Sequence, residues 1–164
     1  MMKRIIVLLA ICLSAFTTNA QTQARKEFGT IYNPEANARE DINQAIATAK
    51  KEHKNVLLQI GGNWCIWCIR FHNLVQKTDS LKTLMDNNYV TVHVNYEKKN
   101  AGDALWKELG YPQRFGFPVF VVLDENGNRV HTQNSAYLEE ADGHSAKKVA
   151  DFLQDWTPAA MSGN

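Results

Sequence analysis

Two cysteines that follow directly after a short apolar segment constrain the fold of this chain more than any other feature. Val56 to Ile60 form a nearly continuous apolar run, which ends at Gly61-Gly62. Such a run, bounded by turn residues, is typical of a β-strand that is buried on both faces of a sheet. Cys65 and Cys68 come next, and apolar residues at helical spacing follow them. The pattern predicts a strand, a short loop that carries the first cysteine, and then a helix.

The rest of the chain alternates between helical and strand patterns. Pro34 suits the start of the first helix, and Asp79 and Ser145 are candidate N-caps of later helices. A turn at residues 125–128 joins the last two strands as a hairpin. This order predicts an α/β fold with a central sheet of mixed direction. We expect helices over residues 34–53, 66–75, 79–85, 101–109 and 146–156, and strands over residues 56–60, 89–94, 117–123 and 129–132.

The first twenty residues have the pattern of a secretory signal peptide. Lys3 and Arg4 precede an apolar run of about 12 residues, and Thr18-Asn19-Ala20 resembles a cleavage site. The alternative is a membrane-spanning helix, but roughly 20 apolar residues are needed to cross a bilayer. The predicted organisation is a signal peptide (1–20), a leader that can hold one short edge strand (21–33), a domain (34–158) and a C-terminal tail (159–164).

Removal of the signal peptide changes both the charge and the cysteine content. The loss of Lys3 and Arg4 turns a net charge of +1 into −1, which gives no electrostatic reason to expect nucleic acid or an anionic membrane as partner. The loss of Cys12 leaves two of the three cysteines, Cys65 and Cys68. An isolated C-x-x-C pair in an oxidising compartment indicates disulfide chemistry.

The spacing of the two cysteines predicts a division of labour between them. Cys65 lies at the expected helix N-terminus, where free N–H groups and the helix dipole stabilise a thiolate, the reactive form of cysteine. Cys68 lies about one turn later, so its sulfur can reach Cys65. We expect Cys65 to attack a client disulfide and Cys68 to resolve the mixed disulfide.

Two other readings of the pair remain open from sequence alone. An unreactive structural disulfide is the first, although a bridge across such a small loop gains little entropy. A zinc or copper site is the second, because Cys65, Cys68 and His72 form a C-x2-C-x3-H pattern. Its fourth ligand would have to come from a distant histidine, and the candidates are His53, His93, His131 and His144.

Trp64-Cys65-x-x-Cys68 after a buried strand, with Phe117-Pro118-Val119 downstream, resembles the thioredoxin superfamily. More narrowly, the chain is similar to periplasmic thioredoxin-like proteins such as the C-terminal domain of the DsbD reductase. The resemblance covers roughly residues 38–156 and implies a thioredoxin fold, a mixed central sheet flanked by helices, here with a short N-terminal extension. It also implies that Pro118 is cis and that Phe117 pairs with an extended client. Trp64, beside the nucleophile, is expected to shape the surface that receives the client.

The chain departs from the family pattern at two positions. Gln59 stands where many thioredoxins carry a buried acid that assists proton transfer, and an amide cannot accept and release a proton near neutral pH. Trp67 stands where these proteins often have proline. The glutamine therefore implies either slower turnover as a general reductant or a proton relay that runs through water or through another residue.

The sequence predicts a monomeric thiol-disulfide oxidoreductase that is exported across the cytoplasmic membrane to the periplasm. Its expected partners are protein thiols and disulfides, with a membrane thiol reductant as a further candidate, and no cofactor or metal is expected. The resemblance alone favours the reductase direction over oxidase or isomerase. The alternative is a metal-binding (zinc or copper) or non-catalytic client-binding module of the same fold.

Overall fold

The computed structural model describes residues 30–100 and 102–163. The predicted signal peptide and most of the predicted leader lie outside these ranges. In the described ranges no helix has the length and apolar character that a membrane span requires.

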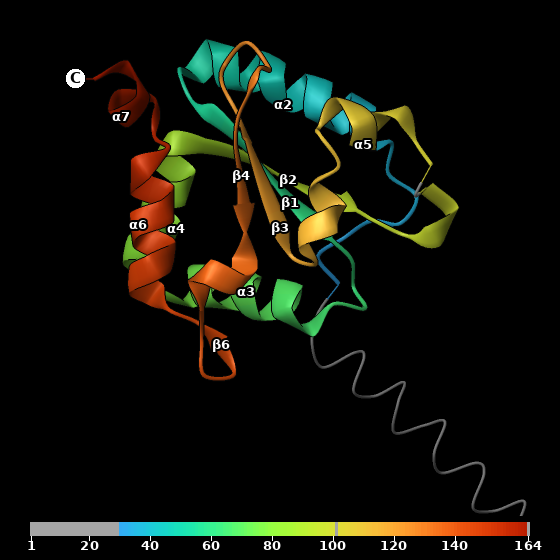
Figure 1. Cartoon of the computed structure of the whole chain (residues 1–164). Coiled ribbons are helices and arrows are strands. Elements are labelled where there is room, and N and C mark those ends of the chain that lie inside the picture. Colours follow the sequence, from blue (N-terminus) through green and yellow to red (C-terminus); the bar gives the residue numbers. More distant parts are fainter. Residues whose placement is uncertain (1–29, 101, 164) are drawn as a thin grey trace, which may run out of the picture. The chain divides into compact units, whose positions relative to one another are not determined.

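A four-stranded sheet of mixed direction lies at the centre of the fold (Figure 1). The strands are ordered β2-β1-β3-β4, with β1 parallel to β2 and antiparallel to β3, and with β3 antiparallel to β4. Every residue of β1 is buried, as expected of an inner strand covered on both faces. The bounds are β1 Asn55–Gly61, β2 Tyr89–Asn95, β3 Val119–Leu123 and β4 Arg129–Asn134.

Helices cover both faces of this sheet. In Figure 1, α2 and α5 lie over one face, whereas α3, α4 and α6 lie over the other. This arrangement confirms the predicted α/β class. The helices are α2 Ala38–Glu52, α3 Ile66–Lys77, α4 Asp79–Asn88, α5 Ala104–Glu108, α6 Ala146–Asp155 and α7 Pro158–Ser162; the short 3-10 helices are η1 Lys98–Asn100, η2 Pro112–Phe115 and η3 Ser135–Leu138; and a small hairpin consists of β5 Glu139–Glu140 and β6 Gly143–His144.

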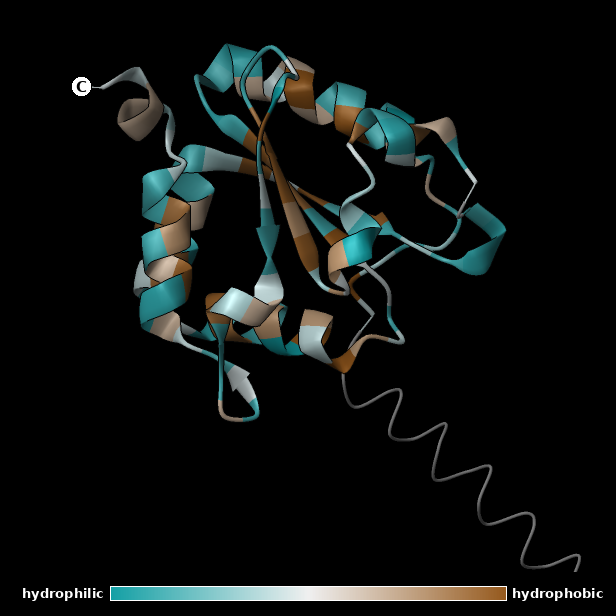
Figure 2. Cartoon of the chain, in the orientation of Figure 1, coloured by the Kyte–Doolittle hydropathy of each residue, from teal (hydrophilic) through white to brown (hydrophobic). Residues whose placement is uncertain are grey.

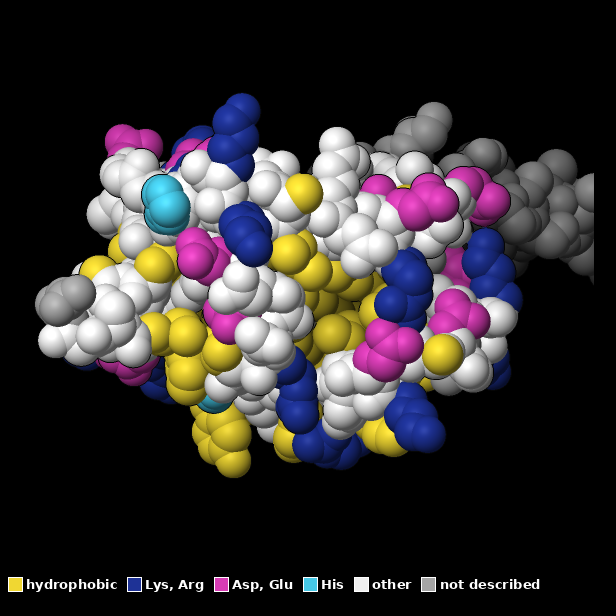
Figure 3. Space-filling view, turned by 90° about the horizontal axis from the view of Figure 1, so that it is seen from above, with side chains coloured by type: hydrophobic (Ala, Val, Ile, Leu, Met, Phe, Trp, Pro, Cys, Tyr) yellow, Lys and Arg dark blue, Asp and Glu magenta, His cyan; other side chains and the backbone are white. Residues whose placement is uncertain are grey.

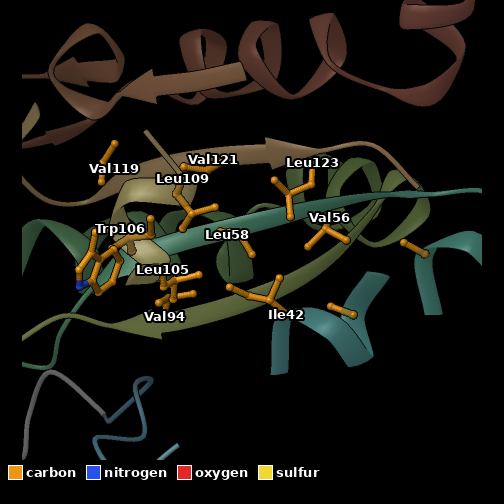
Figure 4. Close-up of a cluster of buried hydrophobic side chains, with 13 residues drawn as sticks. Ile42, Val56, Leu58, Val94, Leu105, Trp106, Leu109, Val119, Val121 and Leu123 are labelled. Carbon is orange, nitrogen blue, oxygen red and sulfur yellow. The ribbon is translucent and has the colours of Figure 1, made fainter. Parts of the chain in front are cut away.

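The alternation of side chains along β1 divides the core into two layers. Val56, Leu58 and Ile60 pack with α2 and α5 in the cluster drawn in Figure 4. Leu57 packs on the opposite face with residues of α3, α4 and α6. Gln59 shares the parity of Leu57, so the sheet directs this polar side chain toward α3. Figure 2 shows the hydrophobic strands between helices whose outer surfaces are hydrophilic.

Several element boundaries differ from those expected. The first helix begins after Asn37 and not at Pro34, because the Asn37 side chain accepts hydrogen bonds from the N–H groups of the first turn. Thr78 is the N-cap of α4, and Asp79 is its first residue. Ser145 is the N-cap of α6, but its side chain makes no capping hydrogen bond. The residues expected to form a C-terminal tail, 159–164, include most of α7, whose N-cap is Thr157.

Candidate functional site

Cys65 lies at the junction of a loop and a helix, as its position after β1 predicted. It is the N-cap of α3, with an extended backbone, and its carbonyl oxygen accepts the N–H of Cys68 and of Ile69. The Cys65 Sγ itself accepts the Cys68 N–H at 3.1 Å. A sulfur in this position receives both a direct N–H and the positive end of the helix dipole, so a thiolate there is stabilised.

The two cysteines form a disulfide. Their Cα atoms are 5.3 Å apart, and their sulfurs are bonded. The two residues differ in access to solvent, because Cys65 keeps 6% of its surface exposed whereas Cys68 keeps none. Cys65 is therefore the more accessible of the two cysteines.

Aromatic residues surround the exposed side of the disulfide. Trp64 is 53% exposed, and the edge of its ring meets Phe117, with centroids 5.2 Å apart. Its indole N–H donates to the carbonyl oxygen of Tyr96, whose ring also packs on Phe117. Pro118 is buried, and the Phe117–Pro118 peptide bond is cis, the isomer that the resemblance implies. Folding thus brings Trp64 into contact with Phe117, the residue before the cis Pro118, although the two aromatic residues are far apart in sequence.

Gln59 lies beneath the disulfide and is 2% exposed. Its Nε2 donates to the carbonyl oxygen of Cys68 at 3.1 Å and to the hydroxyl oxygen of Tyr32 at 3.0 Å. The Gln59 side-chain nitrogen thus donates to the helix that carries Cys68 and to a phenol.

Tyr32 and Asn63 belong to the site, and the sequence analysis missed both. Tyr32 was assigned to the leader, but it is 1% exposed and packs with Cys65 and Cys68. Asn63 holds this segment in place, because its Oδ1 accepts the N–H groups of Ile31 and Tyr32 and its Nδ2 donates to the Tyr32 carbonyl. The segment at residues 30–33 forms no strand. The available signal was Tyr32 itself, one of the few apolar or aromatic residues of the leader.

His72 lies on α3, one turn beyond Cys68, and its ring contacts that of His93, with centroids 5.4 Å apart. Burial lowers the pKa of His72, and burial with a smaller contribution from His72 lowers the pKa of His93 to about 4. A cavity of about 90 Å³ beside these rings is also lined by Gln59. Across residues 30–100 and 102–163, no three His, Cys, Asp or Glu side chains gather closely enough to hold a metal ion.

Trp67 and His144 form the opposite flank of α3. Their rings meet edge to face, with centroids 5.6 Å apart, and the Arg70 guanidinium lies over the Trp67 ring. Neither ring nitrogen of His144 has a hydrogen-bond partner among the described residues. Burial, with a smaller contribution from Arg70, lowers the pKa of His144 to about 4. Trp67 therefore packs along the helix as well as lying beside the cysteines.

Comparison with known proteins agrees with this geometry. The model of the Thioredoxin-like family matches residues 36–125, more than half of the 164 residues. The disulfide bond reductase DsbH of Chlamydia pneumoniae is 24% identical over 97 residues, which are 56% of this chain and 58% of that protein. The chain thus spans less than two thirds of this relative.

A solved structure shares this fold, with a TM-score above 0.5. A disulphide isomerase from Xylella fastidiosa Temecula1 is 24% identical, with a TM-score of 0.68 over 77% of this chain and 96% of that chain. The oxidised C-terminal domain of DsbD from Neisseria meningitidis is 23% identical, with a TM-score of 0.49 over 71% of this chain and 94% of that chain. The predicted thioredoxin fold is confirmed, and the chain belongs to the Thioredoxin-like family.

Proposed function

We propose that the protein is a thiol-disulfide oxidoreductase, which exchanges disulfides with exported protein clients through Cys65 and Cys68, in the direction of a reductase. One observation carries the proposal. The sulfur of Cys65 lies at the N-terminus of α3, where it receives an N–H, and it is bonded to the sulfur of Cys68; Cys65 keeps 6% of its surface exposed, whereas Cys68 keeps none. This difference in access supports the attack by Cys65 and the resolution by Cys68.

The reaction cycle follows from these two positions. The Cys65 thiolate attacks one sulfur of a client disulfide, which forms a mixed disulfide and releases the other client sulfur as a thiolate. Cys68 gives up its proton and attacks the Cys65 sulfur, which closes the protein disulfide and releases the second client thiolate. Two electrons pass from the protein to the client. A dithiol donor must then reduce the Cys65–Cys68 disulfide, and a membrane thiol reductant is the class of donor that we propose.

Trp64, Phe117 and Pro118 are proposed to bind the client. Trp64 offers an exposed indole face beside Cys65, and Phe117 packs at its edge. The ladder between β1 and β3 begins at the pair Ile60 and Val119. The backbone of Phe117 lies before this ladder, so its N–H and carbonyl groups are free to pair with an extended client segment.

The remaining parts of the proposal concern direction and location. The reductase direction is supported by the similarity to DsbH, a protein described as a disulfide bond reductase. Export to the periplasm is supported by the signal-peptide pattern over residues 1–20. On the face seen in Figure 3, Lys and Arg side chains are interspersed with Asp and Glu, which supports protein clients over nucleic acid. We propose that the protein acts as a monomer.

The experiment that tests the direction is equilibration in graded thiol-disulfide buffers. The purified protein is incubated at a series of potentials, its free thiols are alkylated, and the fraction oxidised is read by mass. We expect a reduction potential well below that of the glutathione pool, as a reductant requires. A potential well above that of glutathione would show an oxidase instead.

The roles of the two cysteines are tested by trapping. Cys68→Ser retains the attacking sulfur and lacks the resolving one, so mixed disulfides with clients are expected to accumulate. Cys65→Ser is the matched control, and it is expected to trap almost none, because its remaining sulfur is fully buried. Equal trapping by the two variants would show that the proposed division of labour is wrong.

A further inference from the structure

We infer that Tyr32 is a positioning residue for the resolving step, in which its hydroxyl donates a hydrogen bond to the Cys68 sulfur when that sulfur is a thiolate. The inference rests on the proposed function, and it assigns a role in the site to the segment that precedes the first helix. It also explains how the site works with Gln59 in place of a buried acid.

The position of Tyr32 is built into the loop that carries Cys65. Asn63 lies two residues before Cys65, and its amide makes three hydrogen bonds with the backbone of residues 31 and 32, at 2.8 to 3.1 Å. The Tyr32 side chain then reaches into the interior, where it packs with both cysteines. The same loop therefore holds the nucleophile and the phenol.

The hydrogen bonds of Gln59 determine where the Tyr32 proton can go. A backbone carbonyl only accepts, so the contact with the Cys68 oxygen fixes the orientation of the Gln59 amide, with its nitrogen toward the helix. That same nitrogen donates to the Tyr32 hydroxyl oxygen. Because the oxygen receives this bond, the hydroxyl hydrogen is free to donate to another group.

The geometry at Gly61 points to the Cys68 sulfur as that group. A Cβ atom at Gly61 would lie 2.4 Å from Cys68 Sγ and 2.9 Å from the Tyr32 hydroxyl oxygen. The sulfur and the phenol thus border the same point on β1, which is open because this residue has no side chain. In the disulfide the sulfur is a weak acceptor, whereas a thiolate is a strong one that is shielded from bulk water.

The phenol can serve as a donor and not as a base. Burial raises the pKa of Tyr32 above its ordinary value, and the hydrogen bond from Gln59 offsets part of this rise. The neighbouring ring is that of His93, with centroids 5.5 Å apart, and its lowered pKa leaves it uncharged near neutral pH. The phenol stays protonated near neutral pH, so the proton of the Cys68 thiol leaves to water and not to Tyr32.

Stopped-flow reaction of the reduced protein with dithiobis(nitrobenzoate) separates the two steps. Attack by Cys65 releases the first thionitrobenzoate in a phase that depends on reagent concentration. Attack by Cys68 on the resulting mixed disulfide releases the second in a first-order phase. Loss of a hydrogen bond to the ionised Cys68 sulfur lowers the population of the thiolate by about 10- to 100-fold. The thiolate that remains is more basic and therefore more nucleophilic, so its reactivity rises about threefold for each tenfold loss of population. We expect Tyr32→Phe to slow the second phase by about 3- to 10-fold at pH 7, with the first phase changed less.

Tyr89→Phe is the matched control. Its hydroxyl also makes a buried hydrogen bond, to the Leu153 carbonyl, but it lies in the cluster around α4 and α6. This variant is expected to keep both phases. Gln59→Leu is the second variant. It removes the donor to the Cys68 carbonyl oxygen, and we expect this oxygen to compete with the Cys68 sulfur for the hydroxyl hydrogen of Tyr32. It is expected to slow the second phase in the same direction.

An unchanged second phase in a folded Tyr32→Phe or Gln59→Leu protein would overturn the inference. An equal slowing in the Tyr89→Phe control would also overturn it, because the effect would then be general. Failure of the wild-type protein to release a second thionitrobenzoate would instead refute the proposed function. The two failures are therefore distinguishable in the same experiment.

Discussion

Gly61, the last residue of β1, lies beside the Cys68 sulfur of the disulfide. A Cβ atom there would lie 2.4 Å from Cys68 Sγ and 2.9 Å from the Tyr32 hydroxyl oxygen. Ordinary van der Waals contact begins near 3.4 Å, so Gly61→Ala requires a displacement of about 1 Å. The sulfur cannot make this movement easily in the oxidised protein, because it is bonded to Cys65 at the start of α3.

The expected cost follows from this overlap. Insertion of a methyl group into a packed interior costs about 1 to 3 kcal/mol. Gly61 has no positive φ, so alanine adds no backbone strain and recovers up to about 1 kcal/mol through the unfolded state. Because the overlap involves two atoms closer than 3.0 Å, the cost lies in the upper part of this range, and we expect the free energy of unfolding of the oxidised protein to fall by about 1 to 2 kcal/mol.

Reduction is expected to relieve part of this cost. Without the S–S bond, the Cys68 side chain is free to rotate away from residue 61, so the reduced form of Gly61→Ala should lose about 1 kcal/mol less than the oxidised form. By linkage, each kcal/mol of this difference raises the reduction potential by about 20 mV. Urea unfolding of both redox forms measures the stabilities, and graded thiol-disulfide buffers measure the potential.

Gly143→Ala is the matched control for Gly61→Ala. Gly143 lies on β6, has no heavy atom within 4 Å of the added Cβ and has no positive φ, so its variant should stay within about 0.5 kcal/mol of wild type. Two results would refute the reasoning. One is an oxidised Gly61→Ala protein as stable as wild type, and the other is an equal loss in the two redox forms.

Three further predictions concern the loop, a buried histidine and a helix cap. Asn63→Ala removes the three hydrogen bonds that hold residues 31 and 32, so we expect a loss of about 1 to 3 kcal/mol in urea unfolding and faster proteolysis near residue 33; unchanged proteolysis would contradict this role. The pKa of His144 is lower in the folded protein than in the unfolded chain, so the unfolded chain takes up a proton at a higher pH. The free energy of unfolding should therefore fall as the pH falls from about 6.5 to 4, by about 1 kcal/mol after allowance for the partial exposure of His144. His144→Gln should reduce this slope in unfolding measured at pH 4 to 7, and an identical slope would show that His144 is not the cause. Asn37→Ala should cost about 1 kcal/mol through the loss of the α2 cap, whereas Asn37→Asp should restore it; equal stability of all three proteins in thermal unfolding would show that the cap contributes nothing.

The sequence alone was sufficient for the elements whose signals are local. The apolar run before Gly61 predicted an inner strand, and the spacing of Cys65 and Cys68 predicted a bond between sulfurs at a helix start; the structure has both. Such features depend on periodicity, on turn residues and on reach along one helical turn, all of which are readable from neighbouring residues.

Helix starts were predicted less well, because neighbouring residues compete for the same position. Pro34 and Asn37 are both compatible with the beginning of a helix. In the structure Asn37 is the N-cap, and its side chain accepts hydrogen bonds from the first turn. Thr78 occupies the cap position of α4 that the sequence assigned to Asp79. The α-helical chain can begin at any of several residues within one turn, and its packing against the sheet selects one.

What only the tertiary structure decided is the set of partners that surround the buried cysteine. The sequence shows only that Gln59 replaces an acid and cannot transfer a proton, whereas the structure shows that its amide connects Cys68 to Tyr32, which lies 27 positions before Gln59 in the chain. Asn63 reads as a loop residue, but it anchors a segment more than 30 positions away. Hydrogen bonds between such distant residues leave no periodic pattern in the sequence, because they depend on where the folded backbone places each donor and acceptor.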